Sequence, residues 1–300
     1  LLSLFPIHIF LKERKYLILA GIIKAAGKMS SFFHGKTVIV TGASSGIGES
    51  IAREFARNGS SVMLAARSED RLKRITGELR DQGYDAAYTV TDVSREENCK
   101  ELIAATISRF GRLDILVNNA GISMRAIFTD VDLKVLQRLM EVNFWGTVYC
   151  TKYAIPYLIQ SKGSLVAVSS VAGFHGLPGR TGYSASKFAI HGFMETIRIE
   201  NLRNGLHVMV IAPGFTTSEI RRHALTANGS EQGDSPRPEE KLKSPGFVAR
   251  KVLAGIRHKR RNMILTWDGK LTALFQRIVP RFVDWAYYKA MSKEPRSPLK

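Results

Sequence analysis

The 300-residue sequence predicts an α/β fold, in which a single domain is built on a doubly wound parallel sheet. From residue 37 onwards, short continuous apolar runs alternate with longer helical stretches, which is the pattern of βαβ units whose sheet is covered on both faces. In addition, a glycine-rich turn joins the first of these runs to the first helical stretch. Right-handed crossovers then favour a doubly wound sheet.

The predicted strands are seven short runs of mainly apolar residues. They span 37–42, 61–66, 86–91, 114–121 including the following turn, 164–170, 206–213 and 262–267. The predicted helices show apolar residues at helical spacing, as in the first, where Ile47, Ile51 and Phe55 share one face. These helices span 46–58, 68–82, 95–110, 133–160 and 181–203. Residues 216–246 are a long polar insertion, typical of a lid or a disordered loop.

Three parts are expected along the chain: an N-terminal extension over 1–34, one domain over 35–267, and a basic amphipathic tail over 268–300. The apolar runs of the extension are shorter than the ~20 residues that span a bilayer. Met29 stands shortly before the first strand. We therefore expect residues 29–300 to be the functional protein and 1–28 an upstream extension, with a peripheral membrane anchor as the alternative.

The net charge of +18 is concentrated at the two ends, because residues 1–36 carry +5 and residues 250–300 carry +10. Basic ends favour an acidic partner, either lipid headgroups or nucleic acid, and greater solubility is an equally open explanation.

In the tail, Pro280 should bend or split an amphipathic helix with basic borders and Trp and Tyr side chains. This tail fits a membrane interface, with docking on the body or on a partner subunit as the alternative. We expect peripheral membrane contact through the ends and no nucleic-acid partner.

Several other site types are disfavoured. Cys99 and Cys150 are too few for a disulfide framework or a four-cysteine zinc site, so a reducing, cytoplasmic location is the simpler assumption. The seven histidines show no metal-ligand spacing, and we expect no metal. The sequence has no G-x-S-x-G elbow, which disfavours a Ser-His-Asp hydrolase.

The glycine-rich turn TGASSGIG, at residues 41–48, favours binding of a nucleotide phosphate. Glycines let a phosphate approach the backbone, and the following helix offers free N–H groups and the positive end of its dipole. A turn that serves only helix packing is the alternative, but the strand–turn–helix context favours a nucleotide. The candidate contacts are Gly42, Ser44, Ser45, Gly46, Ile47 and Gly48.

Arg67 favours NADP(H) over NAD(H). A cofactor without a 2′-phosphate usually meets a carboxylate at the end of the second strand, where this chain has Ala66. The guanidinium of Arg67 instead suits a phosphate, and Ser44 could add a hydroxyl. A solvated arginine at the start of a helix is the alternative.

Further motifs follow in a specific order: TDVS at 91–94, NNAG at 118–121, Asn143, Ser170 and YSASK at 183–187. Together with TGASSGIG, they resemble the short-chain dehydrogenase/reductase family over about residues 37–215 and the strand near 262–267. The resemblance implies a Rossmann-like NAD(P)-binding domain and hydride transfer between the nicotinamide and a ketone or secondary alcohol. It also implies a homodimer or homotetramer that assembles through the helices over about 133–160 and 181–203. A non-catalytic cofactor-binding or membrane-associated interaction protein with the same fold is the alternative.

The resemblance assigns catalysis to Asn143, Ser170, Tyr183 and Lys187. Tyr183 and Lys187 stand four residues apart, on one face of a helix. A nearby ammonium should lower the pKa of the tyrosine, which then exchanges a proton with the substrate oxygen as general acid or base. Ser170 would bind that oxygen, and Asn143 would orient the lysine through a water. For these residues taken singly, the alternatives are an ordinary helix pair for Tyr183 and Lys187, a serine that caps the strand end for Ser170, and an exposed mid-helix asparagine for Asn143.

The family pattern also implies further cofactor contacts. Asp92 and Val93 should lie by the adenine, and Asn119, Ala120 and Gly121 in the turn after the fourth strand, where Asn119 braces neighbouring strands. Tyr183 and Lys187 should also contact the cofactor, Lys187 through the nicotinamide ribose. Pro213, Gly214 and Thr216 should lie near the nicotinamide, although this chain has Ser218 where the family usually has threonine.

The substrate pocket is expected between residues 123–127, 173–179 and the insertion at 216–246. Apolar candidates for its lining favour a lipophilic substrate, and packing of the fold is their alternative role. They are Phe174, Leu177, Pro178 and Phe215. The layout resembles family members that reduce lipid-like substrates, including 3-ketosphinganine-type reductases and hydroxysteroid dehydrogenases.

Overall fold

The computed structural model describes residues 31–235, 242–295 and 297–299. It contains one seven-stranded parallel sheet in the order β3-β2-β1-β4-β5-β6-β7. The strands are β1 (Thr37–Thr41), β2 (Ser61–Ala66), β3 (Ala86–Val90), β4 (Ile115–Asn118), β5 (Ser164–Val168), β6 (His207–Ala212) and β7 (Asn262–Ile264). The predicted fold class is confirmed. The strand order reverses between β1 and β4, and ligands of such sheets bind beyond the carboxyl ends of the strands at this point.

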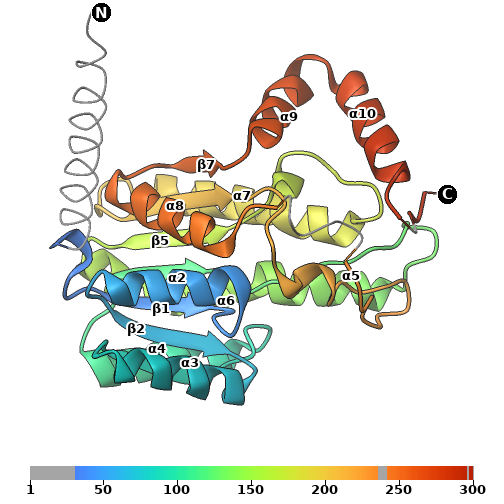
Figure 1. Ribbon diagram of the computed structural model, residues 1–300. Helices are drawn as coiled ribbons and strands as arrows, with labels where there is room; N and C mark the ends of the chain where they lie inside the picture. Colours follow the sequence, from blue (N-terminus) through green and yellow to red (C-terminus); the bar gives the residue numbers. More distant parts are fainter. Residues whose placement is uncertain (1–30, 236–241, 296, 300) are drawn as a thin grey trace, which may run out of the picture.

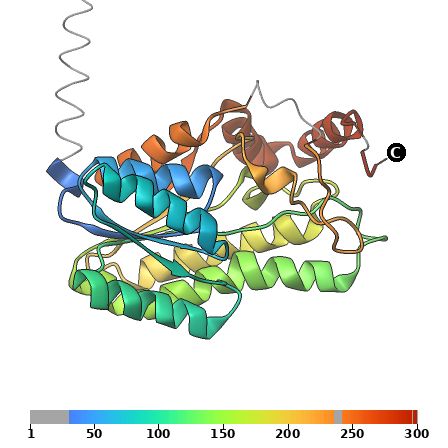
Figure 2. The same cartoon turned by 60° about the horizontal axis from the view of Figure 1, so that its bottom comes forward.

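Helices cover both faces of the sheet (Figures 1 and 2). One face packs against α2 (Gly46–Arg57), α3 (Glu69–Asp81) and α8 (Pro245–Arg257). The other face packs against α4 (Glu96–Phe110), α6 (Gly146–Gln160) and α7 (Thr181–Glu200). Because both faces are covered, the strands are apolar on both sides, which explains the continuous apolar runs in the sequence.

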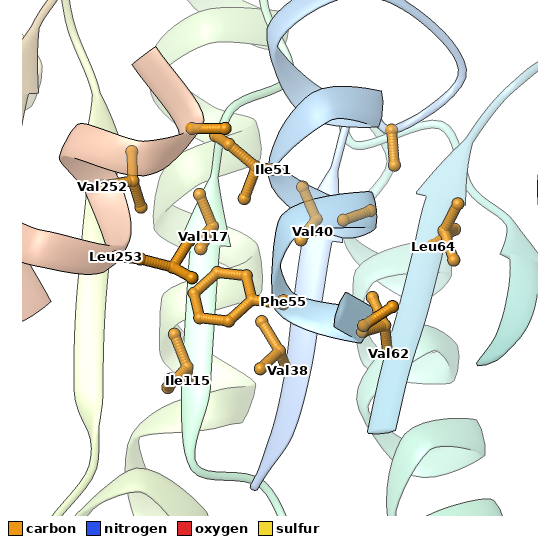
Figure 3. Packing of buried hydrophobic residues seen from close by; sticks show 14 of the residues in the cluster. Val38, Val40, Ile51, Phe55, Val62, Leu64, Ile115, Val117, Val252 and Leu253 are labelled. Carbon is orange, nitrogen blue, oxygen red and sulfur yellow. The ribbon is translucent and has the colours of Figure 1, made fainter. Parts of the chain in front are cut away.

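The helix α8 was not predicted, and its first residues lie in the stretch assigned to the polar insertion at 216–246. Its Val252 and Leu253 are buried in the same cluster as Phe55 of α2 and Val38 and Val40 of β1 (Figure 3). This helix begins with a clear signal, since the Ser244 hydroxyl accepts a hydrogen bond from the Phe247 amide and Pro245 occupies the first turn.

The long helix predicted over 133–160 is present, with one irregular turn. It consists of α5 (Leu133–Leu139), the π-helical turn Met140–Trp145 and α6. Such turns are rare and occur frequently at functional sites. This one carries Asn143, whose side chain is buried.

The tail forms two helices, α9 (Trp267–Ile278) and α10 (Pro280–Ser292), which make an arch at one side of the molecule (Figure 1). The predicted break at Pro280 is confirmed. The predictions for residues 1–28 lie outside the described residues, as does part of the insertion, residues 236–241. Within the part of the chain that the structure describes, no helix has the length and apolar character needed to cross a bilayer.

Candidate active site

The glycine-rich turn has no room for side chains at two of its positions. A Cβ at Gly48 would lie 2.1 Å from the Gly42 carbonyl oxygen, and one at Gly42 would lie 2.8 Å from the Ala120 Cα. Gly42 and Gly46 have φ of +64° and +56°, which glycine adopts most readily. Ser45, at the N-cap of α2, makes no side-chain capping bond. The first amides of α2 therefore lack a side-chain cap at the edge of a cavity of about 630 Å³.

The turn after β4 is held against this glycine-rich turn. The Thr41 hydroxyl accepts hydrogen bonds from the amides of Asn119 and Ala120, both at 3.0 Å. The Asn119 side-chain amide donates to the Thr41 carbonyl at 2.9 Å and to the Gly42 carbonyl at 3.3 Å. These bonds fix the spacing of β1 and β4 where the strand order reverses.

Every cofactor-site residue predicted from the sequence lines the same cavity: Gly42, Ser44, Ser45, Gly46, Ile47, Gly48, Arg67, Asp92, Val93, Asn119, Ala120, Gly121, Tyr183, Lys187, Pro213, Gly214 and Thr216.

Arg67 lies at the wall of the cavity beyond the end of β2 and is exposed. It forms no ion pair with another described residue, whereas Arg138 approaches Asp92 at 3.6 Å. Burial favours a raised pKa for Asp92, but hydrogen bonds from Ser94 and the charges of Arg138 and Arg67 outweigh it and lower the pKa. This end of the cavity is therefore rich in cationic groups.

Lys187 is a buried cation with 4% of its surface exposed. Its Nζ donates a hydrogen bond to the Val168 carbonyl at 3.0 Å and lies 5.7 Å from the centre of the Tyr183 ring. Burial lowers the pKa of Lys187 from 10.5 to about 8. The ammonium is thus the dominant form at neutral pH, although it is held in an unfavourable environment.

Asn143 is fully buried, so the alternative of an exposed asparagine is wrong. Its side-chain oxygen accepts from the Ile122 amide at 2.8 Å, and its nitrogen donates to the Ile122 carbonyl at 3.0 Å and to the Ser186 hydroxyl at 2.9 Å. A Cβ at Gly121 would lie 3.1 Å from the Asn143 oxygen and 3.5 Å from the Lys187 nitrogen. The asparagine and the lysine therefore flank the same small space beside Gly121.

The pKa of the Tyr183 hydroxyl shifts in the opposite direction to the one expected. Burial raises the pKa of its hydroxyl, and the opposing effects of a hydrogen bond with Ser170 and of the Arg180 charge are smaller. The spacing of the two residues predicted instead that Lys187 lowers the pKa of Tyr183. That expectation is wrong for the protein as described, because burial dominates and the ammonium donates to Val168 instead. Tyr183 is therefore protonated at neutral pH and suited to donate a proton.

Ser170 follows β5 and lies beside Tyr183 in the cavity wall. Its oxygen also accepts a hydrogen bond from the Ala172 amide at 3.2 Å. The hydroxyl of the neighbouring Ser169 is instead hydrogen-bonded to the His191 ring at 2.9 Å. The structure thus brings Ser170, Tyr183 and Lys187 together, as the motifs predicted.

The turn after β6 closes the cavity beside these groups. A Cβ at Gly214 would lie 2.5 Å from the Thr266 side chain, so the turn packs directly on the start of α9. The Thr216 hydroxyl donates to the Gly214 carbonyl at 3.2 Å, and Arg221 donates to the Thr216 carbonyl at 2.8 Å.

The expected lining of the substrate pocket is partly wrong. Leu177 and Phe215 line the cavity, but Phe174 and Pro178 are not among its described lining residues. The Phe174 ring packs on His191, with 4.4 Å between the ring centres.

Arg221 and His223 line the cavity from the expected insertion, whereas four other lining residues fall outside the expected segments: Arg138, Arg180, Asp268 and Tyr287. Arg180 could have been found, since it stands three residues before Tyr183 at the start of the same helix. Asp268 stands in the first turn of α9, shortly after β7, and Tyr287 comes from α10, beyond the break at Pro280. The spacing of residues in the sequence does not reveal that both reach the cavity.

Comparison with known proteins places these features in context. The sequence model of a family described as short chain dehydrogenase matches residues 36–228. The 11-beta-hydroxysteroid dehydrogenase 1A of Arabidopsis thaliana is 36% identical over 264 residues, which cover 85% of this chain and 75% of that protein. The 11-beta-hydroxysteroid dehydrogenase-like 4A of the same plant is 44% identical over 217 residues, covering 72% and 70%.

Two solved structures are also similar. The alcohol dehydrogenase from the archaeon Thermococcus sibiricus, complexed with 5-hydroxy-NADP, is 30% identical with a TM-score of 0.69, covering 77% of this chain and 95% of that one. A short chain dehydrogenase/reductase from Burkholderia phymatum in complex with NAD is 24% identical with a TM-score of 0.74, covering 83% and 95%, and shares the fold.

Proposed function

Because the chain belongs to the short-chain dehydrogenase/reductase family of oxidoreductases, we propose that it interconverts a lipophilic ketone and its secondary alcohol with NADP(H). The observation that carries this proposal is the grouping of Ser170, Tyr183 and Lys187 in one wall of the cavity that also contains the glycine-rich turn. Intact catalytic side chains argue against the alternative of a non-catalytic protein with this fold.

The shape and charge of the cavity support a dinucleotide. The absence of side chains at Gly42 and Gly48 lets the glycine-rich turn pack tightly on itself and on the turn at Asn119 and Ala120. The first amides of α2, which have no side-chain cap, lie at the edge of the cavity and could bind a pyrophosphate there. Arg67 supports NADP(H), because its guanidinium forms no ion pair with another described residue and no carboxylate stands at Ala66. When bound, the nicotinamide would supply or take up the hydride.

The protein's own groups would handle the proton and the substrate oxygen. In reduction, Tyr183 donates its proton to the carbonyl oxygen, which its raised pKa favours. Ser170 donates a hydrogen bond to the same oxygen and stabilises the charge that develops there. Lys187, charged below a pH of about 8, stabilises the phenolate that Tyr183 leaves behind. Asn143 holds the Ile122 backbone and faces the lysine across Gly121.

The test is a panel of ketones and secondary alcohols of increasing apolar size, offered with NADPH, NADH and their oxidised forms, and followed by absorbance of the reduced nicotinamide. We expect turnover of at least one apolar ketone, with NADPH preferred. Binding of NADPH without turnover of any ketone or alcohol by the purified protein would favour the non-catalytic alternative.

We also propose that the outer face of α9 and α10 contacts anionic membranes. Its large apolar side chains are exposed: Trp267, Leu274, Ile278, Phe282 and Trp285. Lysines lie over two of the rings, with Lys270 and Lys289 each 4.8 Å from a tryptophan ring centre. Tryptophan beside lysine is typical of a headgroup interface.

Co-sedimentation with vesicles of anionic and of neutral lipid tests this contact. We expect binding to the anionic vesicles that weakens with salt, because exposed charges are screened over ~8 Å at physiological ionic strength. The variant Ile278→Glu/Phe282→Glu should lose binding and keep cofactor affinity. Equal binding by this variant would exclude the contact.

A homodimer or homotetramer remains part of the proposal, supported by exposed aromatic side chains on the helices that the family resemblance assigns to assembly. Trp145, at the end of the π-helical turn, and Phe188 of α7 are each close to half exposed. Light scattering on the wild type and on Phe188→Glu tests it. A monomeric mass for the wild type would exclude it.

A further inference from the structure

Two adjacent serines follow β5, and their hydroxyl groups have different partners. Both Ser169 and Ser170 border the cavity. The Ser170 hydroxyl lies beside Tyr183, whereas the Ser169 hydroxyl is hydrogen-bonded to the His191 ring at 2.9 Å. The bond to His191 therefore occupies the first serine and leaves the second for a substrate oxygen.

His191 lies on the helix that carries the other proposed catalytic groups. Tyr183, Lys187 and His191 follow one another at intervals of four residues on α7, so they lie along one face of the helix. This face meets the end of β5, because Lys187 donates to the Val168 carbonyl and His191 pairs with the Ser169 hydroxyl. Two successive residues, just before the proposed catalytic serine, are thus tied to α7.

The loop that begins at Ser170 is packed around the His191 ring. A Cβ at Gly173 would lie 2.8 Å from the His191 Nε2 and 2.8 Å from the Ser169 Oγ, so only glycine fits there without a shift. The Phe174 ring packs edge-on against the same histidine. The Gly173 amide also donates to the Ser170 carbonyl at 3.0 Å, which closes the turn. The position of Ser170 therefore depends on this tight contact as well as on the end of β5.

The His191 ring is neutral at neutral pH. Burial, together with the charge of Lys187, lowers its pKa from 6.5 to about 4. A neutral ring has one N–H donor and one acceptor nitrogen, and a hydroxyl can pair with either. The histidine therefore contributes a hydrogen bond to Ser169 and adds no second positive charge beside the lysine.

We propose that His191 is a positioning residue, whose hydrogen bond to Ser169 places the Ser170 hydroxyl beside Tyr183. This inference rests on the proposed function, since it concerns two groups of the same site. His191 is not among the described residues that line the cavity, so it acts through Ser169 and the loop that follows.

The hydrogen bonding of Tyr183 reports the position of Ser170 without any turnover. In protein whose tyrosines carry carbon-13 at Cζ, NMR at pH 7 identifies the Tyr183 signal by its absence from Tyr183→Phe. Ser170→Ala should shift this signal, because the phenol loses a hydrogen-bond partner. His191→Leu should shift it in the same direction, and the double variant should shift it no further than Ser170→Ala alone. His191→Gln keeps a side-chain group that pairs with a hydroxyl and should stay close to the wild type.

His207→Leu is the matched control. His207 is hydrogen-bonded to the Ser164 hydroxyl at 3.1 Å, so this variant also removes a histidine–serine bond, but at the opposite end of β5. It should leave the Tyr183 signal unchanged. An equal shift in His207→Leu would show a general loosening of the sheet and overturn the inference.

Ser169→Ala removes the same hydrogen bond from the other side with a much smaller change in volume. It keeps the test decisive if His191→Leu does not fold, and it should shift the Tyr183 signal as His191→Leu does. An unchanged signal in Ser169→Ala or in Ser170→Ala would overturn the inference.

Turnover gives a second readout. With a ketone that the wild type reduces, His191→Leu should lower kcat about tenfold or more, because a misplacement of about 1 Å costs up to ~10²-fold. The KM for NADPH should stay unchanged. In the Ser170→Ala background, His191→Leu should lower kcat no further, and an additive loss would contradict a role through Ser170. Absence of turnover by the wild type would contradict the proposed function alone, and the Tyr183 signal would still decide the role of His191.

Discussion

Replacement of Lys187 by methionine should stabilise the protein while it abolishes turnover. Methionine keeps most of the volume of the side chain and removes its charge. The pKa of Lys187 falls from 10.5 to about 8, and each tenfold change in proton affinity corresponds to about 1.4 kcal/mol. Burial of the charge therefore destabilises the folded protein by about 3 kcal/mol at pH 7.

Replacing the lysine removes this destabilisation, but a lost hydrogen bond offsets part of the stability that is gained. Without the ammonium, the buried Val168 carbonyl loses the donor that stands at 3.0 Å, which costs about 1–2 kcal/mol. We expect Lys187→Met to be about 1–2 kcal/mol more stable than the wild type at pH 7, measured by urea unfolding.

The pH dependence of this difference separates the charge from the hydrogen bond. Below pH 8 the lysine is charged in both the folded and the unfolded protein, so the burial penalty is fully present. As pH rises from 8 to 10.5, the folded protein loses this proton first and the penalty disappears. The stability advantage of Lys187→Met should therefore shrink over this range. Lys152→Met, at an exposed position of α6, is the control and should show no such trend. A difference that is independent of pH would refute the reasoning.

Three further predictions concern turnover and the cofactor. Tyr183→Phe should bind cofactor normally in a fluorescence titration and lose roughly 10²–10⁴-fold in kcat, and near-normal turnover would exclude the proposed proton donor. Arg67→Ala should weaken NADPH by about ten- to a hundredfold and NADH little, because a charge-assisted phosphate contact contributes ~1.5–3 kcal/mol; equal losses in titration would show that Arg67 does not contact the 2′-phosphate. For ketone reduction, kcat/KM should be constant below a pH of about 8 and fall above it as Lys187 loses its charge, while Tyr183 stays protonated; a profile that stays flat beyond pH 9 would contradict this role of the lysine.

The sheet could be predicted from the sequence because its signals are local. Each strand is a short apolar run and each crossover helix has its own apolar face, so the fold follows from segments of about ten residues. The glycine-rich turn and the Tyr183–Lys187 pair were likewise found from residues close in sequence. The helix α8 was missed because Ser244 and Pro245, which mark its start, follow a long run of polar residues that is typical of a loop.

The remaining errors concern contacts between distant parts of the chain. The pKa of Tyr183 depends on how deeply folding buries its hydroxyl, which the spacing to Lys187 does not contain. Phe174 was expected in the pocket, but its ring packs on His191 instead. Tyr287 stands more than a hundred residues after Ser170 in the sequence. Folding places its ring against His175, which belongs to the loop that begins at Ser170.

Two of the buried cationic groups, Lys187 and Arg125, can be explained by the same physical argument. Lys187 is stabilised by a backbone carbonyl and keeps a charge beside Tyr183 at the expense of folding stability. Arg125 is stabilised by Glu294 and the Pro295 carbonyl, and fixes the segment that follows α10, the helix whose Tyr287 lines the cavity. An apolar residue at either position would avoid the penalty of burying a charge. Their placement beside the proposed proton donor and at the anchor of the cavity wall therefore argues that both charges serve the site rather than the stability of the fold.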